Sequence, residues 1–441
     1  MLQVVLTYNT MSESFIHYLW QYQYFDKQGL YTTQGEAIQV IHPGYLNHHA
    51  GPDFQQARVR IGPIDWVGAV EIHIHASGWR SHRHDEDAAY NNVVLHVVWR
   101  EDKPVQRHDG THLPTLELGR RVDDDVVWRY RKLVNSHEPI PCAPALPRVP
   151  SLTVLNMLDR TVVDRLELKA KDVLQHLARN NGDWEETSYQ LLARNFGFKV
   201  NNEPFEQLAQ GLPYKVILKQ RHSLEQIEAL LFGQAGFLTG RQSDDEYLAR
   251  LRREYNVLAA KYNLVQRQLS RAQWRFLRLR PANFPTVRIA QFAALLFTQK
   301  HLFSQMLECQ DAHALKKLFS VQQSEYWRHH YLPGKPAGDA SVPAVGLASV
   351  ENIIINTVAP LVTAYRRLHD EDDAVDKAME LLQAISPEEN HIVTRWTSVG
   401  MRCGSAFDSQ ALLALHNNFC LKRRCLDCNI GFSLLNPTRK E

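Results

Sequence analysis

The chain has 441 residues, 44% of them hydrophobic and 22% charged, and a formal net charge of +2. This composition is typical of a folded globular protein of two or three domains, and the charge balance excludes a globally polycationic nucleic-acid binder. We see no apolar run near the roughly 20 residues of a membrane helix and no signal-peptide pattern at the N-terminus. The six cysteines do not resemble a disulfide framework, so we expect a cytoplasmic protein with no membrane contact.

The first 135 residues predict a domain of alternating helices and strands. The predicted elements, in chain order, are a helix at 12–24, strands at 37–41, 54–61 and 66–75, a short helix at about 85–90 and a strand at 92–99. Gly62-Pro63 marks the turn of a hairpin between the second and third strands. The predicted order is therefore α-β-β-β-α-β.

Two carboxylates fall on the two strands of this hairpin, Asp53 at the start of one and Glu71 on the other. Because strand side chains alternate between faces, Glu71, His73 and His75 share one face, which we expect to be solvent-facing, while the apolar residues between them face a core. Converging carboxylates are oxygen ligands for Mg²⁺ or Mn²⁺. Such an ion activates water and offsets the charge of a phosphate.

Gly51-Pro52-Asp53 and Glu71-Ile72-His73, in this order of elements, resemble the PD-(D/E)xK nuclease superfamily over roughly the first 130 residues. The resemblance implies a restriction-endonuclease-like α/β domain, a small mixed sheet with flanking helices, in which Asp53 and Glu71 hold Mg²⁺ or Mn²⁺ and DNA rather than RNA is cut. His73 stands where the family usually has Lys. A neutral imidazole can bind a metal or accept a proton from water, but it is a poor fixed cation.

Further polar residues are candidates for accessory roles: Glu13, His75, His82, His84 and Tyr90. The simpler alternative is that Pro-Asp only starts a turn and that Glu71 lies on the solvent face of an edge strand. Seven of the 21 histidines fall between residues 48 and 96, which favours metal or phosphate binding over a merely solvated face.

A linker at 136–150 carries five prolines, so we expect it to be extended and stiff. Ser151 then caps a long helix, and helical periodicity continues to about residue 400. The sequence therefore predicts an α+β protein: a nuclease-like domain at 1–135, a large all-α domain at 151–400 and a cysteine-rich, metal-stapled tail at 401–441.

The clearest helix of the second domain starts with a capping box at 243–246 and is predicted to continue to about Arg280, with a break near Asn263 as the alternative. A continuous helix places four arginines on one face: Arg267, Arg271, Arg275 and Arg278. Such a ridge suits phosphate contacts, because the guanidinium fork matches phosphate oxygens. The alternative is a solvated face paired with acidic residues of another helix.

Three cysteines near the C-terminus, Cys420, Cys425 and Cys428, have metal-ligand spacing. Cys403 is the natural fourth ligand and His416 its competitor. We expect structural Zn²⁺, with a [4Fe-4S] cluster as the second choice and unligated thiols as the third possibility. The intervening basic residues suit a clamp on a nucleic-acid backbone: Lys422, Arg423 and Arg424.

The phrase NFCLKRRCLDCNIGFSLL, with GPDF, GAVEIH and LHVV near the N-terminus, resembles a bacterial protein family of unknown function of about this length. That resemblance covers nearly the whole chain and implies that the three clustered cysteines belong to its pattern, but it supplies no activity.

The expected function is a metal-dependent nuclease that uses Asp53, Glu71 and His73 and has nucleic acid, DNA before RNA, as its partner. One alternative is a catalytically inactive nucleic-acid-binding or assembly protein on a nuclease-like fold, with His73 in place of Lys as a sign of lost chemistry. The third and weakest hypothesis is a histidine-rich metallohydrolase of a different fold that acts on small substrates. It needs three converging imidazoles, whereas the strand face offers only His73 and His75.

Overall fold

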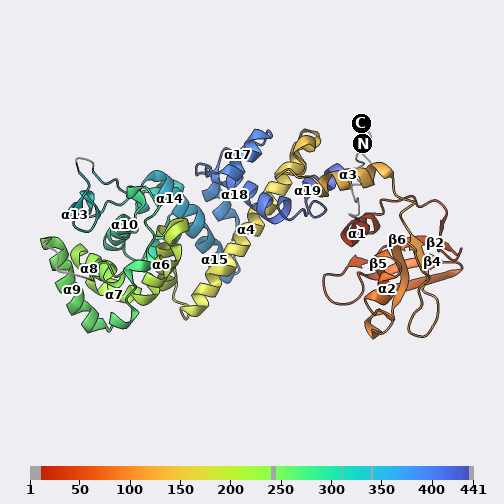
Figure 1. Cartoon of the computed structure of the whole chain (residues 1–441), viewed down its shortest axis with the longest axis horizontal. Coiled ribbons are helices and arrows are strands. Elements are labelled where there is room, and N and C mark those ends of the chain that lie inside the picture. The colour runs from red at the N-terminus through yellow and green to blue at the C-terminus, as the bar shows by residue number, and fades with distance from the viewer. Residues whose placement is uncertain (1–10, 240–244, 310, 339–340, 437–441) are drawn as a thin grey trace, which may run out of the picture. The chain divides into compact units, whose positions relative to one another are not determined.

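The computed structural model describes residues 11–239, 245–309, 311–338 and 341–436 (Figure 1). Its contacts divide the chain into two compact units, residues 1–157 together with 415–441, and residues 158–414. The first unit contains a mixed β-sheet and the second is largely helical, so the expected α+β class is confirmed. The cysteines at 420–428 fall in the first unit, whereas we expected a separate tail that starts at 401.

The first unit has the helices and strands predicted for its first hundred residues, plus several short elements. Its strands are β1 (Leu30–Tyr31), β2 (Ala37–His42), β3 (Tyr45–Leu46), β4 (Phe54–Ile61), β5 (Ile64–His75), β6 (Val93–Arg100) and β7 (Thr115–Glu117). Its helices are α1 (Glu13–Tyr22), α2 (Gly78–Ser81), α3 (Asp124–Val134), α19 (Asn429–Leu435) and the 3-10 helices η1 (Ala88–Tyr90) and η2 (Ala143–Arg148). The helix expected at 85–90 is reduced to η1.

The sheet has seven strands in the order β1-β2-β4-β5-β6-β7, with β3 paired to β4. Strands β2, β4 and β5 pair antiparallel, whereas β5, β6 and β7 pair parallel. The long strand β5 therefore has a neighbour on each side, and Glu71 within it is only 5% exposed. The alternative that placed Glu71 on the solvent face of an edge strand is wrong.

Helix α1 packs against β5 in the first unit (Figure 1). Ser12 caps it by accepting a hydrogen bond from the backbone N–H of Phe15, and Gln23 ends it in the left-handed conformation. Its buried stripe includes Phe15 and Leu19. The same helix presents His17 to the strands, which matters for the site below.

The proline-rich segment is not extended throughout, as we had expected, because residues 143–148 form η2. Proline tolerates this conformation since its fixed φ lies within the 3-10 range. Helix α19 packs against η2 and α3. The Arg129 side chain of α3 donates hydrogen bonds to the carbonyls of Leu434 and Asn436, which fixes the C-terminal segment within the first unit.

The second unit consists of helices joined by short connections, and α4 enters it from the first unit. Its elements are α4 (Ser151–Arg179), α5 (Trp184–Phe196), α6 (Phe198–Gly211), α7 (Tyr214–Gln220), α8 (Leu224–Gln234), α9 (Glu246–Tyr262), η3 (Val265–Arg267), η4 (Arg271–Gln273), η5 (Pro281–Asn283), α10 (Pro285–Thr298), α11 (Leu302–Glu308), α12 (Ala312–Phe319), α13 (Glu325–Arg328), β8 (His330–Leu332), β9 (Lys335–Pro336), α14 (Leu347–Ile353), the π-helix η6 (Ile354–Val358), α15 (Ala359–Leu368), α16 (Asp376–Gln383), α17 (His391–Ser398) and α18 (Ala406–Leu415), which leads into the π-helix η7 (His416–Cys420). Within the described residues, one helical run, 347–368, is long and apolar enough to cross a membrane by length and composition alone, but 72% of the tested window is buried, as in the core helix of a soluble protein.

The predicted continuous helix with an arginine ridge is wrong, and the alternative, a break near Asn263, is confirmed. Helix α9 begins after the N-cap Asp245 and ends at Tyr262, where Asn263 adopts a left-handed conformation; Ser243 and Asp244 lie outside the described residues. The chain then continues through short 3-10 turns because Trp274 is buried and donates a hydrogen bond to the Ala235 carbonyl. The four arginines are exposed but do not share one helix face: Arg267, Arg271, Arg275 and Arg278.

Candidate metal site

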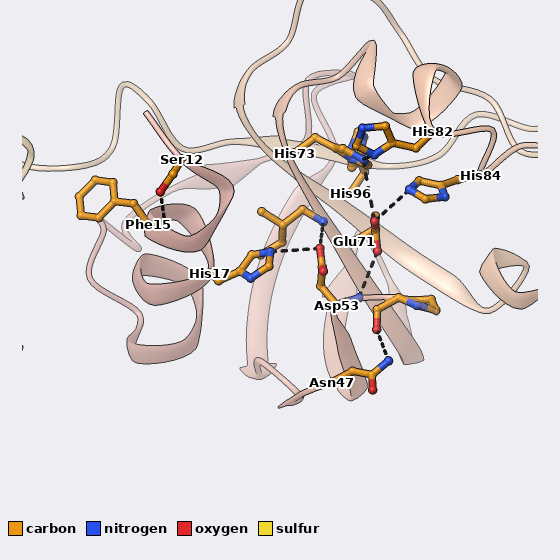
Figure 2. Close-up of polar contacts among 12 residues, drawn as sticks. Ser12, Phe15, His17, Asn47, Asp53, Glu71, His73, His82, His84 and His96 are labelled. Carbon is orange, nitrogen blue, oxygen red and sulfur yellow. Dashed lines mark hydrogen bonds and ion pairs between the residues drawn. The ribbon is translucent and has the colours of Figure 1, made fainter. Parts of the chain in front are cut away.

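The Asp53 and Glu71 carboxylates lie side by side and are each held by the backbone of the other strand (Figure 2). The N–H of Asp53 donates to Glu71 Oε2 at 3.1 Å, and the N–H of Ile72 donates to Asp53 Oδ2 at 2.9 Å. The two carboxylates selected from the sequence are therefore brought together by the pairing of β4 and β5.

The turn before β4 sets the position of Asp53. The Asn47 side chain donates to the carbonyls of Ala50 and Pro52, and its backbone N–H donates to the Asp53 carbonyl at 2.7 Å. Gly51 has a φ of +100°, a conformation that residues with a side chain rarely adopt. Position 51 therefore favours glycine, and the carbonyl of Pro52 accepts one of the hydrogen bonds that fix the turn.

Histidines surround both carboxylates. His17 Nε2 lies 3.2 Å from Asp53 Oδ2, and His84 Nε2 lies 3.2 Å from Glu71 Oε1. His73 Nε2 is 3.9 Å from the same Glu71 oxygen. In the described part of the chain, every ion-pair partner of these two carboxylates is a histidine, and neither is occupied by Lys or Arg.

His73 is the centre of a chain of three imidazoles (Figure 2). Its Nδ1 lies 2.9 Å from His96 Nε2, and its Nε2 lies 3.1 Å from His82 Nδ1. The backbone of Gly78 comes so close that an added Cβ would lie 2.5 Å from Cδ2 of the His73 ring. The ring of His73 is therefore fixed by packing on one side and by hydrogen bonds at both nitrogens.

Burial sets the protonation of these histidines. It lowers the pKa of His73 to about 2, with smaller contributions from neighbouring histidines, and lowers the pKa of His96 to about 3. Both rings are therefore neutral at pH 7. His73 therefore carries no fixed positive charge at pH 7, but its neutral ring can bind a metal.

Three imidazoles offer nitrogen atoms that all lie within 4.8 Å of one another: those of His73, His82 and His84. His73 is buried, His84 is half-buried and His82 is exposed, so this imidazole cluster runs from the sheet to the surface. The His84 ring stacks on Tyr90 at 3.8 Å between centroids. The accessory residues His82, His84 and Tyr90, predicted from sequence, are thus placed beside Glu71 and His73.

The nitrogens nearest the carboxylates fit metal ligands. His17 Nε2 and His84 Nε2 are buried, and each lies 3.2 Å from a carboxylate oxygen, within ion-pair distance. An imidazole nitrogen and a carboxylate oxygen this close to each other are a donor pair that suits Mn²⁺ or Zn²⁺. Burial is the main cause of the raised pKa of Glu71, and the negative charge of Asp53 raises it further. A cation bound between the two carboxylates would offset this repulsion.

The burial of Glu71 and His73 corrects the expectation of a solvent-facing site. Trp79 of α2 packs against the rings of His84 and His96, and Tyr90 of η1 stacks on His84. His75 is exposed, and none of the contacts described for it or for Glu13 reaches either carboxylate. Helix α1 contributes His17 instead, one turn after Glu13.

The remaining sequence candidates lie elsewhere. Cys403 belongs to the second unit, where its sulfur lies 4.0 Å from the Ser405 carbonyl. The other three predicted cysteine ligands are buried in the first unit: Cys420, Cys425 and Cys428. His416 is buried, with Nδ1 3.2 Å from the Asn417 side-chain oxygen. Lys422 and Arg424 are exposed, and Arg424 pairs with Asp427.

The fold and site define an α+β protein in which a buried and a half-buried carboxylate on a mixed sheet lie among imidazoles. The chain matches the model of the family described as protein of unknown function (DUF2851) over residues 13–391, and it belongs to that family. This confirms the family resemblance seen in the sequence; the matched range includes the whole candidate site and ends before the cysteines at 420–428. Neither the curated proteins nor the solved structures gave a match.

Proposed function

We propose that the protein is a metal-dependent phosphodiesterase, a nuclease that acts on DNA rather than RNA. The observation that carries this proposal is the pair of adjoining carboxylates, buried Glu71 and half-buried Asp53, whose described ion-pair partners are all histidines. Two adjoining carboxylates repel each other, more strongly where one of them is buried, and a divalent cation relieves that repulsion. In a protein without catalytic activity, we would expect an arginine beside Asp53 and Glu71 to neutralise their charges in place of a metal ion.

The donor set indicates which ion fits. Glu71 offers an oxygen, and His73 and His84 offer imidazole nitrogens beside it, while Asp53 lies next to Glu71. Mixed oxygen and nitrogen donors favour Mn²⁺ over Mg²⁺, which prefers oxygen ligands and water. A bound ion would supply an activated water and offset the charge on the phosphate.

The chain's own residues have separate tasks. His73 can donate Nδ1–H to His96, the arrangement common for a metal-binding histidine, and a metal on Nε2 would replace the hydrogen bond between Nε2 and His82 Nδ1. His82, at the exposed end of the imidazole cluster, is placed to accept a proton from an attacking water. His17 holds Asp53 from the opposite side.

A second candidate is a zinc hydrolase, and one observation favours it. His73, His82 and His84 form a three-imidazole set, the donor set of a catalytic zinc with an open position. Only two such histidines were evident on the strand, because His82 and His84 come from the turn after α2. In this arrangement Glu71 would act as a general base and not as a ligand.

Metal replacement distinguishes the two candidates. The full chain is stripped with a chelator and reloaded with Mn²⁺, Mg²⁺ or Zn²⁺, and each form is assayed with single-stranded DNA, duplex DNA, RNA and a small phosphodiester. We expect cleavage of DNA with Mn²⁺ above Mg²⁺. Activity with Zn²⁺ alone on the small substrate selects the second candidate, and no hydrolysis under any of these conditions contradicts both.

A further inference from the structure

We infer that the first unit binds a [4Fe-4S] cluster through four buried thiols, those of Cys142, Cys420, Cys425 and Cys428. Cys142 was not among the ligands expected from the sequence. It precedes η2, whereas the other three lie at the end of η7, in the following loop and at the start of α19.

The four sulfurs gather in one place although the chain between the first and second runs through the whole second unit. Each of the four residues is 6% to 8% exposed. Cys142 interacts electrostatically with Cys425 and Cys428, and Cys420 interacts with all three others. Cys425 interacts with Cys428 as well, so every pair among the four is close enough to interact.

Polar contacts fix the segments that carry these cysteines. Arg423 donates from Nη1 to the Cys420 carbonyl and from Nη2 to the Ser136 carbonyl at 2.7 Å, which ties the cysteine loop to the chain just before Cys142. The Cβ of any residue at position 431 would lie 2.0 Å from the Cys425 carbonyl oxygen, so the loop closes on Gly431. The fold therefore holds the segments that carry these cysteines in place.

The thiol chemistry favours a soft metal. Cysteine thiolates are the ligands of iron–sulfur clusters, and a [4Fe-4S] cluster takes four of them. Iron binding would displace one proton from each thiol to solvent and leave four thiolates as ligands. Arg423, which donates to the Cys420 carbonyl, supplies a positive charge beside the anionic assembly.

The spacing of the sulfurs favours a cluster over a single zinc ion. A tetrahedral zinc site, with Zn–S bonds of about 2.3 Å, brings its sulfurs to about 3.8 Å from one another. Among the described residues, the one group with three ligand atoms within 4.8 Å of one another is the imidazole cluster, so the four cysteines are spread more widely. In a [4Fe-4S] cluster each cysteine sulfur binds a different iron atom, so the sulfurs lie farther apart than they do around a single zinc ion.

Metal analysis of the full chain, purified without oxygen, tests this inference. We expect iron and acid-labile sulfide at about four each per chain, with a broad visible absorption. Cys142→Ser should lose most of the iron, and the matched variant Cys403→Ser should keep it. Zinc without sulfide, no bound metal, or loss of iron in Cys403→Ser but not in Cys142→Ser would each overturn the assignment.

Alkylation of the wild-type chain gives a second test that does not depend on a variant that folds. Thiol reactivity is mapped by mass spectrometry before and after oxidative removal of the iron. Cys142, Cys420, Cys425 and Cys428 should gain reactivity together while Cys403 does not change. A gain at Cys403 in place of Cys142 would contradict the ligand set. Neither test requires the proposed nuclease activity.

Discussion

Asp53 and Glu71 are joined by the 3.1 Å hydrogen bond from the backbone N–H of the first to the carboxylate of the second, although they lie on different strands. This contact places the half-buried Asp53 beside Glu71, whose burial in the sheet already raises the pKa of its carboxyl. Such an arrangement destabilises the metal-free protein and favours the metal-bound one. The predictions on the first site follow from this relationship.

Glu71→Gln should weaken Mn²⁺ binding at least tenfold and leave the fold intact, because the amide keeps the shape but not the charge. The melting temperature in chelator should stay the same or rise, since a buried carboxylate is removed. Calorimetric Mn²⁺ titration and thermal melting measure both effects. Asp65→Asn is the matched control, an exposed carboxylate on the same strand, paired with Arg60. Equal Mn²⁺ affinity in Glu71→Gln and Asp65→Asn would remove Glu71 from the site.

The metal-free protein should lose stability as the pH falls below about 6.5. The pKa values of His73 and His96 are lowered to about 2 and 3, so the unfolded chain binds more protons than the folded one in this window. The stabilisation is complete above the unfolded pKa of about 6.5 and declines towards pH 3, by at most about 1.4 kcal/mol per pH unit for each histidine. Urea unfolding between pH 4 and 7 measures the slope, and His96→Gln should reduce it. A slope unchanged by His96→Gln would show that His96 titrates normally in the folded protein.

Gly78→Ala should disturb the imidazole cluster without changing any ligand. Its Cβ would lie 2.5 Å from the His73 ring, so the ring or α2 must move, at a cost of about 1–3 kcal/mol. We expect a lower melting temperature and weaker Mn²⁺ binding. Gly404→Ala is the control, because the nearest atom to its added Cβ is 3.8 Å away. If both variants behave alike, Gly78 does not position His73.

Cys425→Ser combined with Cys428→Ser should release the bound iron and loosen the C-terminal segment. Helix α19 has seven residues, too few for an isolated helix to be stable, so metal binding and local folding are linked. Limited proteolysis should cut the variant within residues 415–436 faster than wild type. Cys309→Ser serves as a control for the loss of a cysteine in the second unit. Equal protease resistance and iron content in the double variant and wild type would show that these cysteines are not ligands.

The exposed arginines of the second unit still allow a test of nucleic-acid binding. Changing Arg267, Arg271 and Arg275 to Gln should weaken DNA binding and flatten the slope of log affinity against log salt by roughly 2 to 3. Their side chains are exposed, so the fold should persist. DNA affinity measured at several salt concentrations, for wild type and the triple variant, gives the two slopes. An unchanged slope would mean that DNA, if bound, contacts other residues.

The site residues that could be predicted from the sequence are those set by the local pattern of a strand or a turn. Strand alternation and a glycine-proline turn suffice to select Asp53, Glu71 and His73. His17 was missed because its role depends on how α1 packs against β5, although it lies one turn from the candidate Glu13. The convergence of His82 and His84 with His73 requires the return of the chain through α2, which no periodicity encodes.

The failures elsewhere have the same physical origin. The helix expected up to Arg280 ends early because Asn263 takes a left-handed conformation. Trp274 beyond it is buried and hydrogen-bonded to Ala235 at the end of α8, so tertiary packing outweighs helix propensity. Cys142 escaped notice because it is separated from the other cysteines by the whole second unit. Only the packing of α19 against η2 brings it to them.

The cleavage of labelled DNA in the presence of Mn²⁺ tests the central claim most directly, with wild type, Glu71→Gln and Asp65→Asn prepared in parallel. The account predicts cleavage by wild type and Asp65→Asn, its loss on addition of chelator, and at least a hundredfold slower reaction with Glu71→Gln, the effect of removing a group that binds the essential ion. Cleavage by Glu71→Gln at the wild-type rate, or no cleavage by a wild-type protein shown to bind Mn²⁺, would contradict it.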